Sequence, residues 1–576
     1  MTNPLRLLST SLLVLALAIG AGSAATPLHV RYPSITGSFL AGQQAMVDLR
    51  MDDAARYFRD ASEVDWDNPI IVERAFIALA GSGQVEQAAA TAQRLLELQP
   101  DNELARLVVA TEAMKQRRYD AAAAELDKLG AETFAGITGG ILRAWAFAGD
   151  KDLDKAYAVL DDIGRDGLGD FLVFHRALMA DVAGDSAKAL EFAARAHEVD
   201  PFVARIVEAY SRMLGNAGRF DEATDVIRQF ESEGLTHPLV DVVKASIENK
   251  ERPGLFATNV QSGAAEMFHG IGVALARDGS VDLSMVFLQL GLYLDPSADV
   301  IALVIGQLLD TNGQHEAANA IYDRIPATSP MKPTAVVRVA ENLDALGDRS
   351  EAIRRLGNIV RANPDDLDAL SVLGDLQRTD ERYKEAAETY TRALDAVSGD
   401  TPGDWRFYYV RGIAYERAKE WPKAEADFLR SLELRPDQPQ VLNYLGYSWV
   451  DQGINLEPAL DMIEKAVAAA PNDGYIIDSL GWAFYRLGRY DEAVEALEQA
   501  VQLRPNDPEI NDHLGDAYWR GGRTLEARFQ WNIAADVDDE GNVKARVAPK
   551  LAGGLDAAPQ TEDSAPVVEE PAAIIQ

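Results

Sequence analysis

The stretch LNYLGYSW at residues 442–449 returns as IDSLGWAF at residues 477–484. In both, an apolar residue is followed three positions later by Leu-Gly, and an aromatic ring stands three residues after the glycine. The glycine belongs to a longer series, with spacings of 34, 35 and 34 residues, at Gly412, Gly446, Gly481 and Gly515. A period of this length indicates a stack of similar supersecondary units rather than one globular core.

A small residue carries the same period through the rest of the chain. It follows the four glycines at Ala424, Ala459, Ala493 and Ala527. Nearer the amino terminus it steps by 34, 34, 34, 33, 34, 61, 34, 34 and 34 residues, at Ala54, Ala88, Ala122, Ala156, Ala189, Ala223, Ser284, Ala318, Ala352 and Ala386. The spacing fits a hairpin of two helices with small side chains where the axes approach. Stacking such hairpins buries the apolar face that one hairpin leaves exposed.

Proline closes the better matched units, at Pro436, Pro471 and Pro505, where it stops the second helix. Glycine, aromatic, alanine and proline in this order are similar to the tetratricopeptide-repeat pattern W-x2-L-G-x2-Y…A-x3-F…P. The sequence resembles the tetratricopeptide-repeat family over about residues 40–537. The resemblance implies an all-α fold, a right-handed tetratricopeptide-repeat α-solenoid of about fourteen helix hairpins.

The period and its interruptions predict the organisation of the chain. The 61-residue step leaves surplus sequence with a Pro-Gly break, and we expect an extra helix at 239–249 followed by a loop. The predicted segments are a signal peptide at 1–25, a linker at 26–39, divergent units at 40–235, an insertion at 236–266, central units at 267–396, a short insertion at 397–404, well-matched units at 405–537, and an extension at 538–576 whose tail is predicted to be disordered from about residue 552.

The amino terminus has the features of an export signal. Arg6 precedes an apolar run at residues 12–19, and Ser23-Ala24-Ala25 offers a cleavage site. An uncleaved anchor is the alternative, but the run is shorter than the roughly 20 residues that a spanning helix needs. We expect a periplasmic mature chain without a transmembrane segment, and secretion from the cell is the less favoured destination.

Charge and composition exclude several classes of function. The chain has 91 acidic and 55 basic residues, a net charge of −36, which repels nucleic acid. The same charge favours basic partners or serves only to keep a long helical protein soluble. No cysteine occurs, so disulfides, thiolate metal sites, a cysteine nucleophile and a lipobox anchor are all excluded.

We find no motif for catalysis. The seven histidines include no pair at i,i+4 spacing, and Walker-type and lipase-type motifs are absent. The repeats leave no second domain for a reaction. No catalytic residue, metal site or cofactor is therefore predicted, and the oligomeric state is left open. A repeat-containing enzyme or a carbohydrate-handling protein of the cell wall is the rival hypothesis.

The resemblance also implies where a partner would bind. In this family the first helix of each pair lines a concave groove, through the positions six and three before the glycine and one and four after it. The predicted partner-binding residues are Asn443, Tyr447, Tyr475, Asp478, Trp482, Tyr485, Asp512, Asp516 and Trp519. Large aromatics on an exposed face indicate a partner, and packing against neighbouring repeats is the alternative.

These features lead to one functional hypothesis. The carboxyl-terminal repeats resemble those of bacterial cell-envelope scaffold and adaptor proteins. We expect a non-catalytic interaction scaffold that binds protein or peptide partners with basic and apolar segments, and the insertion at 250–263 is the next candidate surface.

Overall fold

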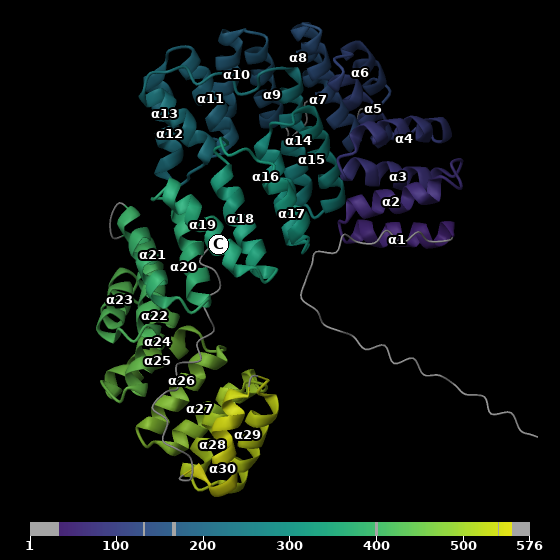
Figure 1. The fold of residues 1–576 in the computed structure, drawn as a ribbon. Helices are drawn as coiled ribbons and strands as arrows, with labels where there is room; N and C mark the ends of the chain where they lie inside the picture. Colours follow the sequence, from purple (N-terminus) through teal and green to yellow (C-terminus); the bar gives the residue numbers. More distant parts are fainter. Residues whose placement is uncertain (1–33, 131–132, 164–168, 398–400, 540, 556–576) are drawn as a thin grey trace, which may run out of the picture. The chain divides into compact units, whose positions relative to one another are not determined.

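The structure is a computed structural model that describes residues 34–130, 133–163, 169–397, 401–539 and 541–555 (Figure 1). The predicted signal peptide, most of the predicted linker and the tail from residue 556 lie outside these residues. The described residues form thirty α-helices and one short 3-10 helix, with no β-strand. The prediction of an all-α fold is confirmed.

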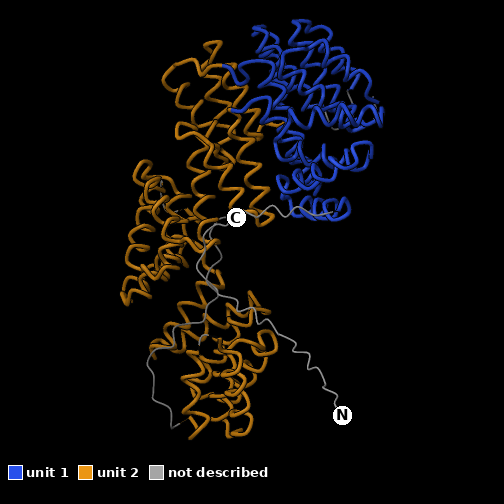
Figure 2. Tube along the Cα trace, turned by 45° about the vertical axis from the view of Figure 1, so that its right-hand side comes forward, with its two compact units in different colours: residues 1–199, 255–296 blue, residues 200–254, 297–576 orange. Residues whose placement is uncertain are grey.

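The chain divides into two compact units (Figure 2). Unit 1 consists of residues 1–199 and 255–296, so the chain leaves this unit and later returns to it. Its helices are α1 Ile35–Val47, α2 Met51–Ser62, α3 Pro69–Gly81, α4 Val85–Leu98, α5 Glu103–Lys115, α6 Tyr119–Leu126, α7 Phe134–Gly149, α8 Leu153–Ile163, α9 Gly169–Val182, α10 Ser186–Val199, α14 Val260–Arg277 and α15 Val281–Leu294.

Unit 2 consists of residues 200–254 and 297–576. Its helices are α11 Ala204–Asn216, α12 Phe220–Ser232, α13 Pro238–Glu248, α16 Asp299–Thr311, α17 His315–Tyr322, α18 Lys332–Ala345, α19 Arg349–Ala362, α20 Leu367–Thr379, α21 Tyr383–Ala396, η1 Pro402–Asp404, α22 Trp405–Arg417, α23 Trp421–Leu434, α24 Pro439–Asp451, α25 Leu456–Ala469, α26 Gly474–Arg486, α27 Tyr490–Leu503, α28 Pro508–Arg520, α29 Thr524–Val537 and α30 Asn542–Gly553.

Fourteen helix pairs are formed by these elements, as the period predicts, and the small residue of the period explains their packing. Every one of its fourteen members lies in a second helix and is 0% exposed. Ser284 fits the same place because its hydroxyl donates to the carbonyl of Gly272 at 2.7 Å, in the first helix of its own pair. The period therefore records the closest approach of two helix axes.

The recurring glycines lie on the first helix at the same close contact between the two helices of a pair. A Cβ at Gly412 would lie 2.6 Å from the Phe428 ring, and one at Gly446 would lie 2.8 Å from Ile463. Both partners are buried in the second helix of the same pair. Any larger residue would push the paired helices apart.

Caps define where the first helices begin. The Asp473 carboxylate accepts from the backbone N–H of Tyr475 at 3.0 Å and starts α26. Asp507 accepts from the N–H of Ile510 at 3.0 Å and starts α28. These bonds satisfy donors that a helix start leaves open. Many acidic residues in the turns therefore act as caps.

Two helices stand outside the pairs. The first, α13, lies at the position of the predicted extra helix and packs on α11 and α12. The second, α30, lies inside the predicted extension and packs on α28 and α29. It begins one repeat length after α28, so it takes the place of the first helix of a further unit, and the described residues end at residue 555, two positions after it. The helix α30 was not predicted from the sequence.

Candidate functional site

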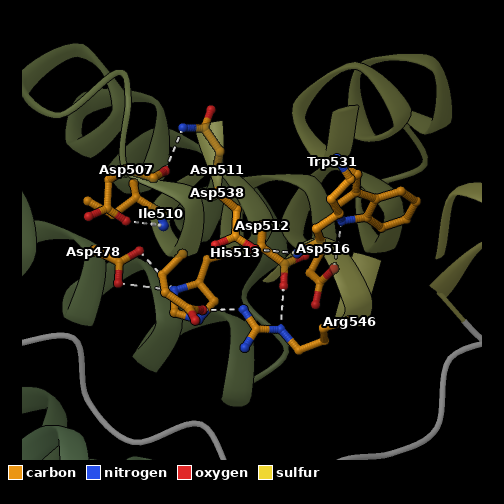
Figure 3. A network of polar contacts seen from close by, with 12 residues as sticks. Asp478, Asp507, Ile510, Asn511, Asp512, His513, Asp516, Trp531, Asp538 and Arg546 are labelled. Atoms are coloured by element: carbon orange, nitrogen blue, oxygen red, sulfur yellow. Dashed lines mark hydrogen bonds and ion pairs between the residues drawn. The ribbon is translucent and has the colours of Figure 1, made fainter. Parts of the chain in front are cut away.

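The predicted binding residues around Gly481 form a stack of rings instead of an open surface. The Trp482 ring lies between two others, with its centroid 4.7 Å from that of Tyr485 and 4.3 Å from that of His513. His513 reaches over from α28, and its Nδ1 lies 3.0 Å from both carboxylate oxygens of Asp478 (Figure 3). These contacts join α26 to α28.

The ion pair in this stack sets the charge of the histidine. Burial by itself would lower the pKa of His513, but the carboxylate of Asp478 and nearby Glu509 and Asp512 raise this pKa to about 9. His513 is therefore a buried cation at neutral pH. Its charge is matched by Asp478, so that carboxylate already has a partner within the chain.

The predicted residues around Gly515 are covered by α30. The Lys550 ammonium lies 2.7 Å from Asp512 and 2.8 Å from Asp516, and Arg546 donates to Asp512 at 2.8 Å. Figure 3 shows Arg546 reaching Asp512, and it shows Trp531 beside Asp516. Burial raises the pKa of Asp516 to about 6, Asp512 adds to this effect and Lys550 opposes it. The end of α30 also packs against the Trp519 ring at Gly554.

The remaining predicted residues are also packed. Asn443 and Tyr447 are buried in α24, and the Tyr475 ring is half-buried with the guanidinium of Arg504 4.7 Å from its centroid. Trp482, Tyr485 and Trp519 are partly buried against the same core. The exposure assumed for these aromatics is therefore not found, and packing accounts for their positions. Their role in binding a partner stays a prediction.

A row of polar residues lies on neighbouring first helices, and only one of its members, Asn443, was predicted from the sequence. Ser371 in α20, Tyr409 in α22 and Asn443 in α24 each stand three residues before a glycine (Gly374, Gly412 and Gly446), and they are 4%, 4% and 1% exposed. Among the described residues, the Ser371 hydroxyl, the Tyr409 hydroxyl and the Asn443 Oδ1 have no hydrogen-bond partner. We call these three residues the polar row.

The next two residues at the same position differ from the polar row. Asp478 is paired with His513, and Asp512 with Lys550 and Arg546. The sequence contains a signal for the row, because the position three residues before the glycine is one of the predicted groove positions. The predicted site uses this position only in the three best-matched units, which do not include α20 and α22.

In unit 1 the first helices carry a helix pair of their own chain. The pair α14–α15 packs on α3, α5, α7 and α9. The Lys115 ammonium donates to the carbonyl of Tyr293 at 2.6 Å, and the Gln261 amide donates to the carbonyl of Met114 at 3.0 Å. A Cβ at Gly263 would overlap the buried Trp145 ring. This face of unit 1 is therefore part of its core.

Two further features bear on the kind of site. Among the described residues, no cluster of histidine and carboxylate side chains could hold a metal ion. No helix in the same part of the chain is long and apolar enough to cross a membrane.

Family comparisons identify the repeat. A family model described as tetratricopeptide repeat matches residues 340–401 and 390–439, and one described as TPR repeat matches residues 481–522. All three stretches lie in unit 2. The polar-row residues Ser371 and Tyr409 lie within the first two.

A curated protein and two solved structures are also similar. The TPR repeat-containing protein PA4667 of Pseudomonas aeruginosa is 27% identical over 182 residues, which are 31% of this chain and 30% of that protein. This chain therefore spans less than a third of that relative. The APC/C hetero-tetramer Cut9-Hcn1 is 14% identical with a TM-score of 0.37, over 91% of this chain and 97% of that one. A tetratricopeptide repeat protein from Parabacteroides merdae is 14% identical with a TM-score of 0.37, over 43% and 96%.

Proposed function

We propose that this chain, which carries tetratricopeptide repeats, is a non-catalytic scaffold or adaptor of the bacterial cell envelope. It binds a protein or peptide partner along the polar row on α20, α22 and α24. An array of such repeats supports protein interaction in general.

The single observation behind the site is that one buried polar atom of each polar-row residue has no hydrogen-bond partner among the described residues. Buried polar groups nearly always have a partner, and one left without a partner costs about 1–3 kcal/mol. Three such groups fall at one repeat position on successive first helices. A peptide backbone offers donors and acceptors at regular intervals, and hydroxyl and amide groups can pair with either. The row is covered in this structure, since its three residues are at most 4% exposed, so a partner reaches it only when the helices over it move apart. An extended segment inserted there would satisfy all three.

The character of the partner follows from charge. The chain has a net charge of −36, which favours basic segments during encounter. Burial raises the pKa of Tyr409, so the hydroxyl keeps its proton and can donate to a carbonyl. We propose a partner segment with basic and apolar side chains whose backbone pairs with the row.

The test combines the capture of partners with substitutions that remove one polar group at a time. The mature chain is used to capture partners from the native envelope, and each partner is measured against Tyr409→Phe and Asn443→Leu. Both variants remove an unpaired polar group, so binding should fall about fivefold or more while stability is kept. Tyr390→Phe is the matched control, because that hydroxyl already donates to Asp375 at 2.7 Å. Unchanged capture by both row variants would place the site elsewhere.

The location is tested separately. Residues 1–25 have the pattern of a cleavable signal. Intact-mass measurement of native material should therefore find a chain that begins near Ala25 or Thr26. Full-length protein in the membrane fraction would contradict a periplasmic adaptor.

A further inference from the structure

An apolar stripe runs along the outer side of α29. Leu525 and Phe529 are 79% and 67% exposed, and Ile533 is partly exposed one turn further on. Residues four apart lie on the same side of a helix. The side that packs into the array is a different one, with Ala527, Trp531 and Ala534 at 0% exposure. We call Leu525, Phe529 and Ile533 the α29 stripe.

The same positions in the two preceding second helices are polar. One repeat earlier, α27 carries Asp491, Glu495 and Gln499, and one repeat before that, α25 carries Glu457, Asp461 and Lys465. All six are exposed. Second helices of this array therefore fold with polar residues at these places, and packing does not require the apolar ones in α29. An exposed phenylalanine beside an exposed leucine marks an interaction surface.

The surface beside the stripe is acidic. The helix α27 contains four carboxylates and no basic residue. Arg523, at the start of α29, joins the two helices by donating to Glu498 at 2.9 Å. Asp491 and Glu495 have no ion pair with another residue that the structure describes. A partner seated on the stripe would therefore meet rings and methyl groups with negative charge on the side of α27 and the exposed Arg528 within α29 itself.

We propose that the α29 stripe is a docking surface for a basic amphipathic helix of another protein. The apolar side of that helix covers Leu525 and Phe529, and its lysine or arginine residues face Asp491 and Glu495. A second copy of this chain is a poor occupant, because its net charge of −36 repels an acidic surface. The surface is formed by second helices, so it is separate from the polar row on the first helices.

The test uses the full mature chain and a synthetic helical probe. The probe has leucine at every fourth position and lysine beside each leucine, and its affinity is measured by fluorescence anisotropy. Leu525→Asp with Phe529→Glu gives α29 the carboxylates that α27 already carries, so folding is kept. We expect this variant to bind the probe about tenfold more weakly or worse. Simple attraction between charges would instead strengthen binding, because the variant gains two negative charges.

Three controls complete the design. Asp491→Asn with Glu495→Gln should weaken binding about two- to fivefold at low salt, with the difference fading as salt is added. A probe with glutamate in place of lysine should not bind. Trp66→Ala, at an exposed ring of unit 1 outside both proposed surfaces, should bind the lysine probe as the unaltered chain does. The proposal is overturned if the stripe variant binds the lysine probe at full strength, or if sedimentation shows a dimer of this chain that the stripe variant abolishes.

Discussion

The first helices of unit 1 and those of unit 2 face different surroundings. In unit 1 they carry α14–α15, and the contacts include a buried tryptophan and hydrogen bonds to helix ends. In unit 2, α20, α22 and α24 hold, at one repeat position, three buried polar atoms without partners among the described residues, while His513 and α30 close the face further along. The same repeat position thus serves as core in one unit and as a candidate site in the other. Whether the position is core or a candidate site depends on whether another segment of the chain, such as α14–α15, covers it.

The largest effect should come from Trp145→Ala in unit 1. Trp145 is 0% exposed, and its indole N–H donates to His175 Nδ1 at 3.3 Å. Truncating such a ring costs about 3–5 kcal/mol. Hydrogen exchange followed by mass spectrometry should show α7, α9 and α14 losing protection together. Trp66→Ala is the control, because its ring is exposed and should change stability by less than about 0.5 kcal/mol. Retained protection in α14 would show that α14–α15 is not part of the core.

A smaller loss should follow Trp482→Ala with Tyr485→Ala in unit 2. As exposed binding residues they could be removed without cost, but the stack with His513 predicts a loss of about 2–4 kcal/mol. Thermal melting checks this, with Phe529→Ala as an exposed aromatic control of the same unit. If the double variant melts like the unaltered chain, the rings are not core, and their assignment to a partner regains its basis.

The two buried histidines should give the units opposite responses to pH. The raised pKa of His513, about 9, stabilises unit 2 fully below about pH 6.5, and this contribution is lost as the pH rises toward 9. Burial lowers the pKa of His175 in unit 1 to about 4, although Glu266 opposes this. Folded unit 1 therefore loses stability as the pH falls from about 6.5 toward 4, since only the unfolded chain takes up the proton.

Denaturant unfolding across pH, with His513→Gln and His175→Gln compared to the unaltered chain, separates these contributions. His513→Gln should flatten the alkaline side of the profile, and His175→Gln the acid side. Identical profiles for all three proteins would mean that neither histidine has the charge inferred from its surroundings.

The smallest effect distinguishes two tyrosines of unit 2. Tyr390→Phe removes a hydroxyl that donates to Asp375 at 2.7 Å and should cost about 1 kcal/mol. Tyr409→Phe removes one without a partner, so stability should stay unchanged or rise slightly. Chemical denaturation measures both. A loss at Tyr409 as large as that at Tyr390 would show that its hydroxyl is satisfied in solution.

The sequence predicted what the period controls. Alanine at Ala54 or Ala493 reports the contact of two helices within one pair, so the pairs and their number could be predicted without coordinates. Ser284 kept its place in the series because its hydroxyl finds a carbonyl in the same pair.

Contacts between segments outside the period could not be predicted in this way. The pairing of Lys115 with Tyr293 joins residues 178 positions apart, and no spacing rule relates them. Lys550 lies in the segment predicted to be a carboxyl-terminal extension. Asp512 and Asp516 were therefore predicted to be available to a partner. His513 and Asp478 follow the period more closely, since they are 35 positions apart, but a spacing near one repeat does not by itself predict that two side chains meet.

The return of the chain to unit 1 has a consequence for the time course of folding. Helical repeats usually fold through contacts close in sequence, which form early. Unit 1 must instead wait for α14 and α15, which end 78 and 95 residues after the end of α10. At roughly 5–20 residues per second, the apolar side chains of α7 and α9 stay without the cover of α14 for about 4–16 s. In that interval the growing chain presents a surface that aggregation or a chaperone can reach, and the interval ends when α14 packs on α7 and α9.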